Sequence, residues 1–290
     1  MAGKLFAPLA DRAVIAVAGA DAHGFLQGLV TNDVDRVAPD RAIYAALLTP
    51  QGRYLFDFFI VEIDGTLHLD CEAARRDELL RRLAMYRLRA KVSLASADGL
   101  ATIAAFGEGA VDALGLAENA GVARRFAGGV AYVDPRNAKA GVRVLAPPDA
   151  ARAALEAAGF RDGQFSDYDT MRIAAGLPDS GRDMVAERAL LLELGFEALN
   201  GVDFEKGCYV GQEVTTRMKR RDLVKKLLMP VMIEGRAPEP GTKILRGDVE
   251  AGELRSSGDG AGLALLRLDM VDGGVALTAG EARIVPRPRS

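Results

Sequence analysis

The octapeptide that decides the fold reads Lys206-Gly207-Cys208-Tyr209-Val210-Gly211-Gln212-Glu213. Its two glycines allow the backbone to turn tightly and to approach a ligand closely. We expect a helix to begin near Val210, which places Cys208 close to a helix N-terminus and two positions from Lys206. A helix N-terminus and a neighbouring cation both lower the pKa of a thiol and favour the reactive thiolate. Cys208 is therefore the first candidate for a chemical role, and the alternative is a small buried residue.

The chain upstream of this octapeptide alternates between strand and helix patterns. Helices are expected at 22–29, 73–86, 149–158 and 166–175, and strands at 13–17, 42–48, 54–63, 66–70, 91–94, 102–106, 130–133 and 141–145. Thr49-Pro50-Gln51-Gly52 and Asp64-Gly65 are turn signatures, and Asp64-Gly65 predicts a hairpin. Strands joined in this way and interspersed with helices favour an α+β fold over a doubly wound parallel sheet.

From Leu227 onward the pattern changes to short strands separated by Gly, Pro and Asp. These strands are expected at 228–233, 242–245, 252–256, 262–266 and 282–285. No helical periodicity is evident there, so a small β-barrel is predicted to end the chain. The boundary falls in the charged stretch 217–226, which gives a first domain of residues 1–222 and a barrel domain of residues 223–290.

Composition restricts the class of protein. The chain has 290 residues, of which 49% are hydrophobic and 27% charged, and its net charge is −3. These values fit a soluble protein with a substantial core and exclude a globally basic nucleic-acid binder. Every apolar run is interrupted before about 18 residues, so no membrane span is expected. The N-terminal residues contain no long apolar run, and no secretory signal is expected.

The cysteines and histidines are few and far apart. Cys71, Cys208, His23 and His68 show no short ligand spacing, so no structural metal site is predicted. We interpret both cysteines as reduced thiols, and with no secretory signal this interpretation predicts a cytoplasmic protein. No dinucleotide fingerprint or phosphate loop is present.

The octapeptide resembles the K-G-C-Y-x-G-Q-E signature of the YgfZ family, which is related to the T-protein (aminomethyltransferase) of the glycine cleavage system. The resemblance covers nearly the whole chain: residues 25–34 resemble the family's F-L-Q-G-x-x-T-x-D-V pattern, and residues 171–178 its R-I-x-A-G-x-P segment. T-proteins carry two adjacent aspartates after the first hairpin, whereas this chain keeps only Asp57. The G-R-x-L-x-D arrangement at 52–57 is therefore more similar to the mitochondrial iron–sulfur assembly branch.

The resemblance implies a T-protein-like folate-binding domain of paired α+β subdomains, followed by the C-terminal β-barrel. It implies tetrahydrofolate, or a one-carbon derivative, as cofactor and a role in the assembly or repair of iron–sulfur proteins, especially [4Fe–4S] proteins. The implied partners are folate and iron–sulfur client or assembly proteins, and the role would support tRNA modification indirectly. The essential cysteine of the family corresponds to Cys208, and the folate-holding arginine of T-proteins corresponds to Arg172.

The candidate site residues form three groups. The catalytic candidates are Cys208 and Lys206, and the folate-binding candidates are Arg172, Asp57 and Asn32. Asp57 can accept hydrogen bonds from pterin N–H groups or act as a base, the alternative being a carboxylate on a strand surface. The remaining motif residues are Gly207, Tyr209, Gly211, Gln212 and Glu213.

Three functions remain open on these residues. The first is a folate-dependent maturation factor that uses Cys208 as a nucleophile or as a transient iron ligand. The second is an aminomethyltransferase, which would make the protein a folate-dependent one-carbon transferase. The third is a non-enzymatic scaffold that binds a partner through the barrel or the basic stretch 217–226. That stretch can hold the glutamyl tail of folate, contact phosphate, or be a solvated helix end, and without an RNA-binding module direct RNA contact is not predicted.

Overall fold

The computed structural model describes residues 3–271 and 276–287. The chain folds as two compact units, and it passes from one to the other several times. The described residues of unit 1 lie within 1–48, 55–168 and 199–210, and those of unit 2 within 49–54, 169–198 and 211–290. None of the helices in these residues is long and apolar enough to cross a membrane.

Unit 1 contains a five-stranded sheet that is covered by two helices. The strand order is β3 (Ile43–Leu48), β4 (Tyr54–Ile63), β5 (Thr66–Glu72), β2 (Arg12–Ala18) and β6 (Ser93–Ser96). The predicted Asp64-Gly65 turn connects β4 to β5, and both of its residues have positive φ, as such tight hairpins require. Helices α1 (Ala22–Gln27) and α2 (Arg76–Arg87) contribute Leu26, Leu79 and Leu83 to the core with the sheet. Short 3₁₀ turns occur at Val34–Arg36 and Ala73–Arg75.

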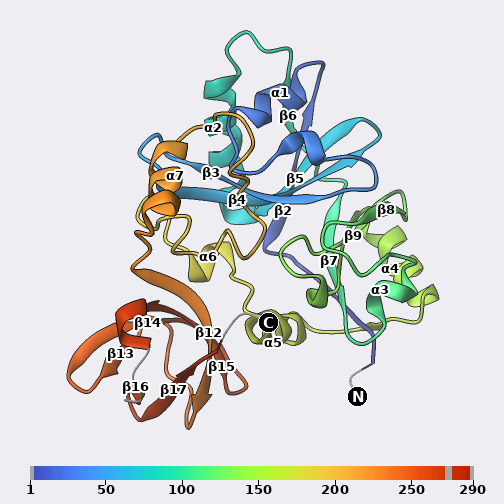
Figure 1. Cartoon of the computed structure of the whole chain (residues 1–290). Helices are drawn as coiled ribbons and strands as arrows, with labels where there is room; N and C mark the ends of the chain where they lie inside the picture. The colour runs from blue at the N-terminus through green and yellow to red at the C-terminus, as the bar shows by residue number, and fades with distance from the viewer. Residues whose placement is uncertain (1–2, 272–275, 288–290) are drawn as a thin grey trace. The chain divides into compact units, whose positions relative to one another are not determined.

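A second, six-stranded sheet completes unit 1 (Figure 1). Its core includes Ala151 and Leu155 of helix α4 (Pro148–Ala157). The strand order is β11 (Arg161–Asp162), β1 (Leu5–Pro8), β7 (Ala101–Phe106), β10 (Val142–Ala146), β9 (Gly129–Val133) and β8 (Ala123–Phe126), with α3 (Ala110–Ala113), α4 (Pro148–Ala157) and a 3₁₀ turn at Ala138–Ala140 in the connections.

Unit 2 contains the C-terminal barrel. Its six strands close in the order β12 (Lys226–Glu234), β15 (Ala261–Arg267), β14 (Val249–Gly258), β13 (Lys243–Arg246), β16 (Leu277–Ala279) and β17 (Ala282–Pro286). The predicted barrel is therefore present, and a short helix that the sequence pattern does not reveal, α8 (Leu268–Val271), follows β15. A single helical turn is too short to produce a periodic apolar pattern.

The rest of unit 2 consists of short helices and turns. It includes helix α5 (Phe165–Ala174) from residue 169 onward, followed by α6 (Ser180–Asp183) and α7 (Gln212–Arg221). The predicted turn at Gly52 lies against the start of α7: a Cβ atom on Gly52 would lie 2.7 Å from the Val214 Cβ atom. Gly52 also has φ +74°, a conformation that glycine adopts without strain. Two sheets with their helices and a closed C-terminal barrel confirm the predicted α+β fold class.

Candidate functional site

Lys206 attaches the first half of the octapeptide to the loop that follows α1. Its Nζ atom donates hydrogen bonds to the carbonyl oxygens of Gln27, Val30 and Asn32, at 2.9, 2.6 and 2.8 Å. An ammonium group has three donors, so these bonds use its full capacity. The carbonyls at the end of a helix lack partners within the helix, and Lys206 supplies partners to this region.

Three further hydrogen bonds join the loop after α1 to residues 200–203, which precede the octapeptide. The Thr31 hydroxyl donates to the Gly201 carbonyl at 2.6 Å, and the Asp203 amide donates to the Thr31 carbonyl at 3.0 Å. The Asn32 side chain donates to the Asn200 carbonyl at 2.8 Å. Hydrogen bonds thus connect two distinctive sequence segments, 25–34 and the first part of 206–213. Of the octapeptide, residues up to 210 belong to unit 1.

The environment of Lys206 combines partial burial with nearby acidic groups. Burial lowers the pKa of its ammonium to about 8, and the charges of Asp33, Asp203 and Asp35 act in the opposite direction. The ammonium also lies 5.3 Å from the centre of the Tyr209 ring. Because the ammonium is directed at carbonyl oxygens, the structure gives Lys206 a role in positioning the loop. Its catalytic assignment stays a prediction.

The two cysteine thiols differ in accessibility. Cys208 is exposed, so the alternative of a small buried residue does not hold for it. Cys71 is buried on β5, and burial raises the pKa of its thiol to about 12. Gly207, next to Cys208, has open space around the position of a Cβ atom. The loop therefore presents an accessible thiol, and the residue before it has no side chain.

The last three residues of the octapeptide form the N-cap and the start of α7 in unit 2. Gly211 is the N-cap residue with φ +80°, and Gln212 and Glu213 form the first turn. The expected helix start near Val210 is wrong by two residues, because the left-handed conformation of Gly211 delays the helix. Cys208 thus precedes the first helical residue by four positions. A carboxylate such as Glu213 in the first turn stabilises the helix dipole.

The folate-binding candidates Asn32 and Asp57 are both linked to Tyr44 in unit 1. The Tyr44 hydroxyl donates to an Asp57 carboxylate oxygen at 2.8 Å, and the Asn32 side chain donates to the Tyr44 carbonyl at 2.8 Å. Asp57 is only 4% exposed, so the alternative of a strand-surface carboxylate does not hold. Burial and the Asp57 charge raise the pKa of Tyr44, which keeps its hydroxyl a donor.

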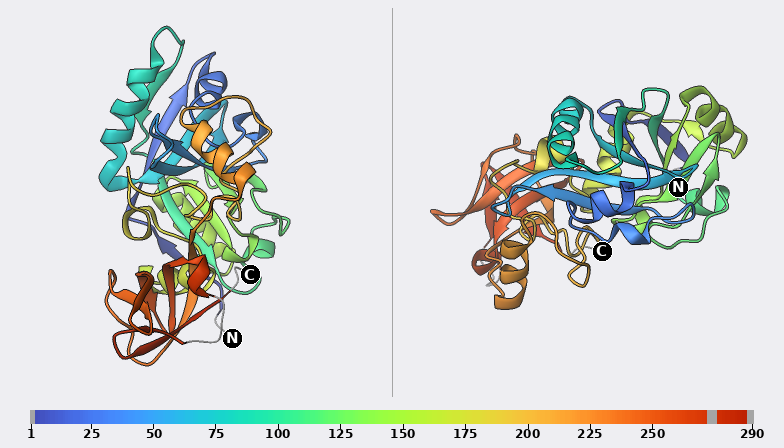
Figure 2. Two further views of the ribbon diagram at one scale, coloured as in Figure 1. Left: turned by 60° about the vertical axis from the view of Figure 1, so that its left-hand side comes forward. Right: turned by 90° about the horizontal axis from the view of Figure 1, so that it is seen from above.

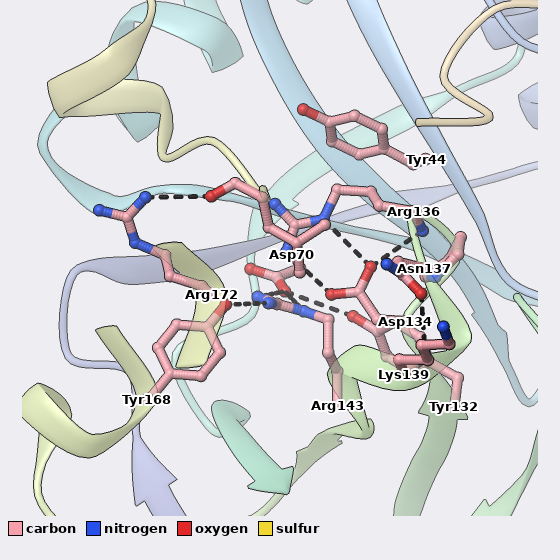
Figure 3. A network of polar contacts seen from close by, with 12 residues as sticks. Tyr44, Asp70, Tyr132, Asp134, Arg136, Asn137, Lys139, Arg143, Tyr168 and Arg172 are labelled. Atoms are coloured by element: carbon pink, nitrogen blue, oxygen red, sulfur yellow. Dashed lines mark hydrogen bonds and ion pairs between the residues drawn. The ribbon is translucent and has the colours of Figure 1, made fainter. Parts of the chain in front are cut away.

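Two buried arginines, Arg136 and Arg143, and the partly buried Arg12 surround Phe59 next to these residues. The guanidinium carbons of Arg143, Arg136 and Arg12 lie 4.0, 4.9 and 5.7 Å from the centre of its ring. Asp134 forms an ion pair of 2.8 Å with Arg136 (Figure 3). Asp57 and Asp70 are also buried, and the charge of Asp57 acts on Arg12, so three carboxylates accompany the three guanidinium groups.

Asp70 is the centre of the ionic part of this network. It is fully buried and accepts hydrogen bonds from Arg12 and Arg143, each at 2.8 Å, and from the Tyr132 hydroxyl at 3.3 Å (Figure 3). Burial alone would raise the pKa of Asp70, but the two arginines outweigh burial and lower it. This network was not predicted from the sequence. Its signal was Arg143 within the apolar run 141–145, where a buried charge requires a partner.

Arg172, the third folate-binding candidate, lies in unit 2 and is 1% exposed. Its guanidinium donates to the carboxylates of Asp169 and Asp183 at 2.6 and 2.8 Å, to the Leu177 carbonyl at 3.0 Å, and to the Ser256 hydroxyl at 3.2 Å. These contacts join α5 and α6 to strand β14 of the barrel. Its folate-binding role stays a prediction, and the structure does not bring it together with Asn32 and Asp57 in one unit.

The described residues contain no group of three or more His, Cys, Asp or Glu side chains arranged to hold a metal ion. Cys208 therefore has no set of metal-ligating side chains around it within the part of the chain that the structure describes.

Comparisons with known proteins show which proteins this chain resembles. The family profile of the CAF17 C-terminal β-barrel domain matches residues 225–290. The chain is 34% identical to the human mitochondrial iron–sulfur cluster assembly factor IBA57, over 94% of this chain and 80% of that protein. The mouse IBA57 protein is 32% identical, over 96% of this chain and 81% of its own length.

A solved structure supports the fold assignment. The glycine cleavage system aminomethyltransferase T from Bartonella henselae superposes with a TM-score of 0.79, covering 98% of this chain and 84% of that one. The sequence identity is 15%, so this likeness shows the fold alone. It confirms the predicted T-protein-like architecture with a C-terminal barrel.

The predicted cytoplasmic location is wrong by these comparisons, because the similar curated relatives are mitochondrial proteins. That prediction relied on the interpretation of both cysteines as reduced thiols. Reduced thiols indicate only a reducing environment, which does not single out the cytoplasm.

Proposed function

Because the chain belongs to the IBA57 family of iron–sulfur cluster assembly factors, we propose that it acts in the assembly of iron–sulfur proteins through Cys208. The observation that carries this proposal is an exposed thiol on a loop that Lys206 holds in place. A thiolate is both the nucleophilic form of cysteine and the form that binds iron. Iron–sulfur clusters need several thiolate ligands. Cys208 would thus provide one ligand or nucleophile, and a client or assembly protein would provide the others.

Loss of this thiol should stop maturation without unfolding the protein. We expect Cys208→Ser to lose most of the ability to restore [4Fe–4S] enzyme activity in cells that lack the protein. Cys71→Ala is the matched control, because Cys71 is buried and burial raises the pKa of its thiol. Support of tRNA modification would follow indirectly, through iron–sulfur enzymes. Full activity of a folded Cys208→Ser protein would refute the proposed thiol role and favour a scaffold.

We also propose tetrahydrofolate, or a one-carbon derivative, as a ligand of unit 1. Asp57 and Asn32 fit this ligand because they are buried polar groups next to aromatic Tyr44 and Phe59. A carboxylate has about four acceptor positions. Asp57 can therefore accept hydrogen bonds from pterin N–H groups while it keeps its bond from Tyr44. Bound folate would supply a carrier for one-carbon groups.

Calorimetric titration with tetrahydrofolate tests this ligand. We expect binding by the wild type, and Asp57→Asn should weaken it by about tenfold, because a hydrogen bond to a charged group contributes roughly 1.5–3 kcal/mol. Cys208→Ser should bind as the wild type does. No binding by the folded wild type would remove folate from the proposal but leave the thiol role intact.

A further inference from the structure

A second surface of unit 1, remote in sequence from the octapeptide, has the composition of a docking site. We call residues 81–91 the α2 tip. Two of its large apolar side chains, Met85 and Leu88, are 67% and 89% exposed. The chain has no acidic residue between Glu78 and Asp98. The basic side chains of the α2 tip are Arg81, Arg82, Arg87, Arg89 and Lys91.

The positive charges of the α2 tip are not neutralised within the described residues. No ion pair or side-chain hydrogen bond involves its five basic side chains there. The first turn of the same helix differs: Arg75 pairs with Glu78, and Arg76 pairs with Asp77 and Asp98. The charges are thus paired where the helix begins and unpaired where it ends.

The backbone of the α2 tip is anchored in a conformation that exposes Leu88. Leu88 has φ +44°, which is rare for a side chain of this size and persists only where neighbouring contacts impose it. The Lys91 amide donates to the Asp21 carboxylate at 2.7 Å, and a Cβ atom on Gly19 would lie 2.1 Å from the Lys91 carbonyl oxygen. The residue after Lys91, Val92, is buried. Leu88 is therefore held outward by its surroundings.

The figures agree on where this turn lies within unit 1. In Figure 1 and in the left view of Figure 2, the segment between α2 and β6 forms the outermost turn at that end of unit 1. Such a position makes Met85 and Leu88 accessible to a large molecule.

We propose that the α2 tip binds an acidic segment of a partner protein, with an apolar side chain of that segment against Met85 and Leu88. Four of the five cations are arginines, whose planar fork pairs with carboxylates, and protein interfaces are enriched in Arg and Met. A membrane-bound helix needs a broad apolar face. Here Leu79 and Leu83 are instead buried in the core of unit 1.

A defined peptide tests this surface by fluorescence anisotropy with the full chain. The probe is a labelled synthetic peptide in which glutamates flank two leucines, and its control has glutamine in place of glutamate. We expect the glutamate peptide to bind at least about tenfold more tightly, since several charge pairs and a buried apolar anchor act together. Binding should weaken with rising salt.

Variants separate the apolar and ionic contributions. Leu88→Ser should weaken binding by about tenfold, and the double variant Arg87→Glu/Arg89→Glu should abolish it. Val249→Ser is the matched control, because Val249 is an exposed apolar residue of unit 2. Cys208→Ser should bind as the wild type does, so this test is independent of the thiol role.

Two results would overturn the proposal. One is equal affinity of the wild type and the Leu88 and arginine variants for the glutamate peptide. The other is binding to phosphatidylglycerol vesicles that the same variants lose, without binding to the peptide, which would assign the α2 tip to lipid. In cells, a photo-crosslinker at position 88 should capture acidic peptides that a crosslinker at position 249 does not.

Discussion

Removal of the Lys206 ammonium should measure how strongly the Cys208 loop is held. Lys206→Met keeps the length of the side chain but leaves the carbonyls of Gln27, Val30 and Asn32 without their donor. Hydrogen bonds to a charged group contribute about 1.5–3 kcal/mol each. Because Lys206 is only partly buried, water can replace part of this contribution, and we expect a total loss of about 3 kcal/mol in the free energy of unfolding.

Urea unfolding and thiol reactivity together are the assay. Lys219→Met is the control, because Lys219 forms an exposed ion pair with Glu197, and such pairs contribute about 0–1 kcal/mol. Lys206→Met should also change the rate at which Cys208 reacts with a disulfide reagent, whereas Lys219→Met should not. If Lys206→Met costs no more stability than Lys219→Met and leaves the thiol rate unchanged, the positioning role is refuted.

The replacement Lys206→Arg tests the geometry of the same contact. Three carbonyl oxygens converge on one nitrogen, which suits a compact ammonium with three donors. A guanidinium is planar and spreads its donors over a fork, so it cannot direct three of them to one point. We therefore expect Lys206→Arg to recover less than half of the stability lost in Lys206→Met. Complete recovery would mean that charge alone holds the loop.

Other predictions concern the core, a turn and the second thiol. Asp70→Asn should cost about 3–5 kcal/mol, because it leaves two arginines uncompensated, whereas Asp98→Asn at an exposed pair should cost less than about 1 kcal/mol. Thermal unfolding of both variants checks this difference. Gly52→Ala should destabilise more than Gly65→Ala, since both have similar positive φ but only Gly52 lacks room for a Cβ atom; urea midpoints would show the opposite order if the contact with α7 were unimportant. The raised pKa of Cys71, about 12 against 9.0, means that the protonated thiol stabilises the fold fully below pH 9 and that this contribution is lost as the pH rises toward 12. The stability difference between wild type and Cys71→Ala should therefore shrink above pH 9, and a constant difference in unfolding titrations would contradict it.

Local signals were sufficient for much of the fold. The Asp64-Gly65 turn and the flanking branched and aromatic residues predicted the hairpin of β4 and β5, because its hydrogen bonds join neighbouring segments. Strand β1 was missed because its four residues carry little local pattern. Its pairing is with β7 and β11, which lie far away in the sequence. Such a strand is stabilised by tertiary contacts, which propensity does not report.

In the candidate site, too, local sequence patterns predicted some residues, whereas contacts between distant residues were missed. Cys208 was found because its sequence context is distinctive, and the exposed thiol agrees with that choice. The network around Asp70 was missed because the alternation of side chains along a strand indicates only the face of the sheet that a residue occupies. It does not indicate which charged side chains contact that residue. Arg12 and Arg143 reach Asp70 from positions 58 and 73 residues away. No local sequence pattern predicts these two contacts with Asp70.

The octapeptide therefore combines residues with different physical tasks. Lys206 donates its three hydrogen bonds to the loop after α1. Tyr209 is buried, with its ring close to the ammonium, whereas Cys208 between these two residues is exposed. A flexible exposed loop would lose entropy each time its thiol met a partner. A loop fixed on both sides of the cysteine has already lost that entropy in folding, so more of the contact energy is available for binding. On this argument the lysine assists Cys208 through the backbone rather than through the charge of its ammonium.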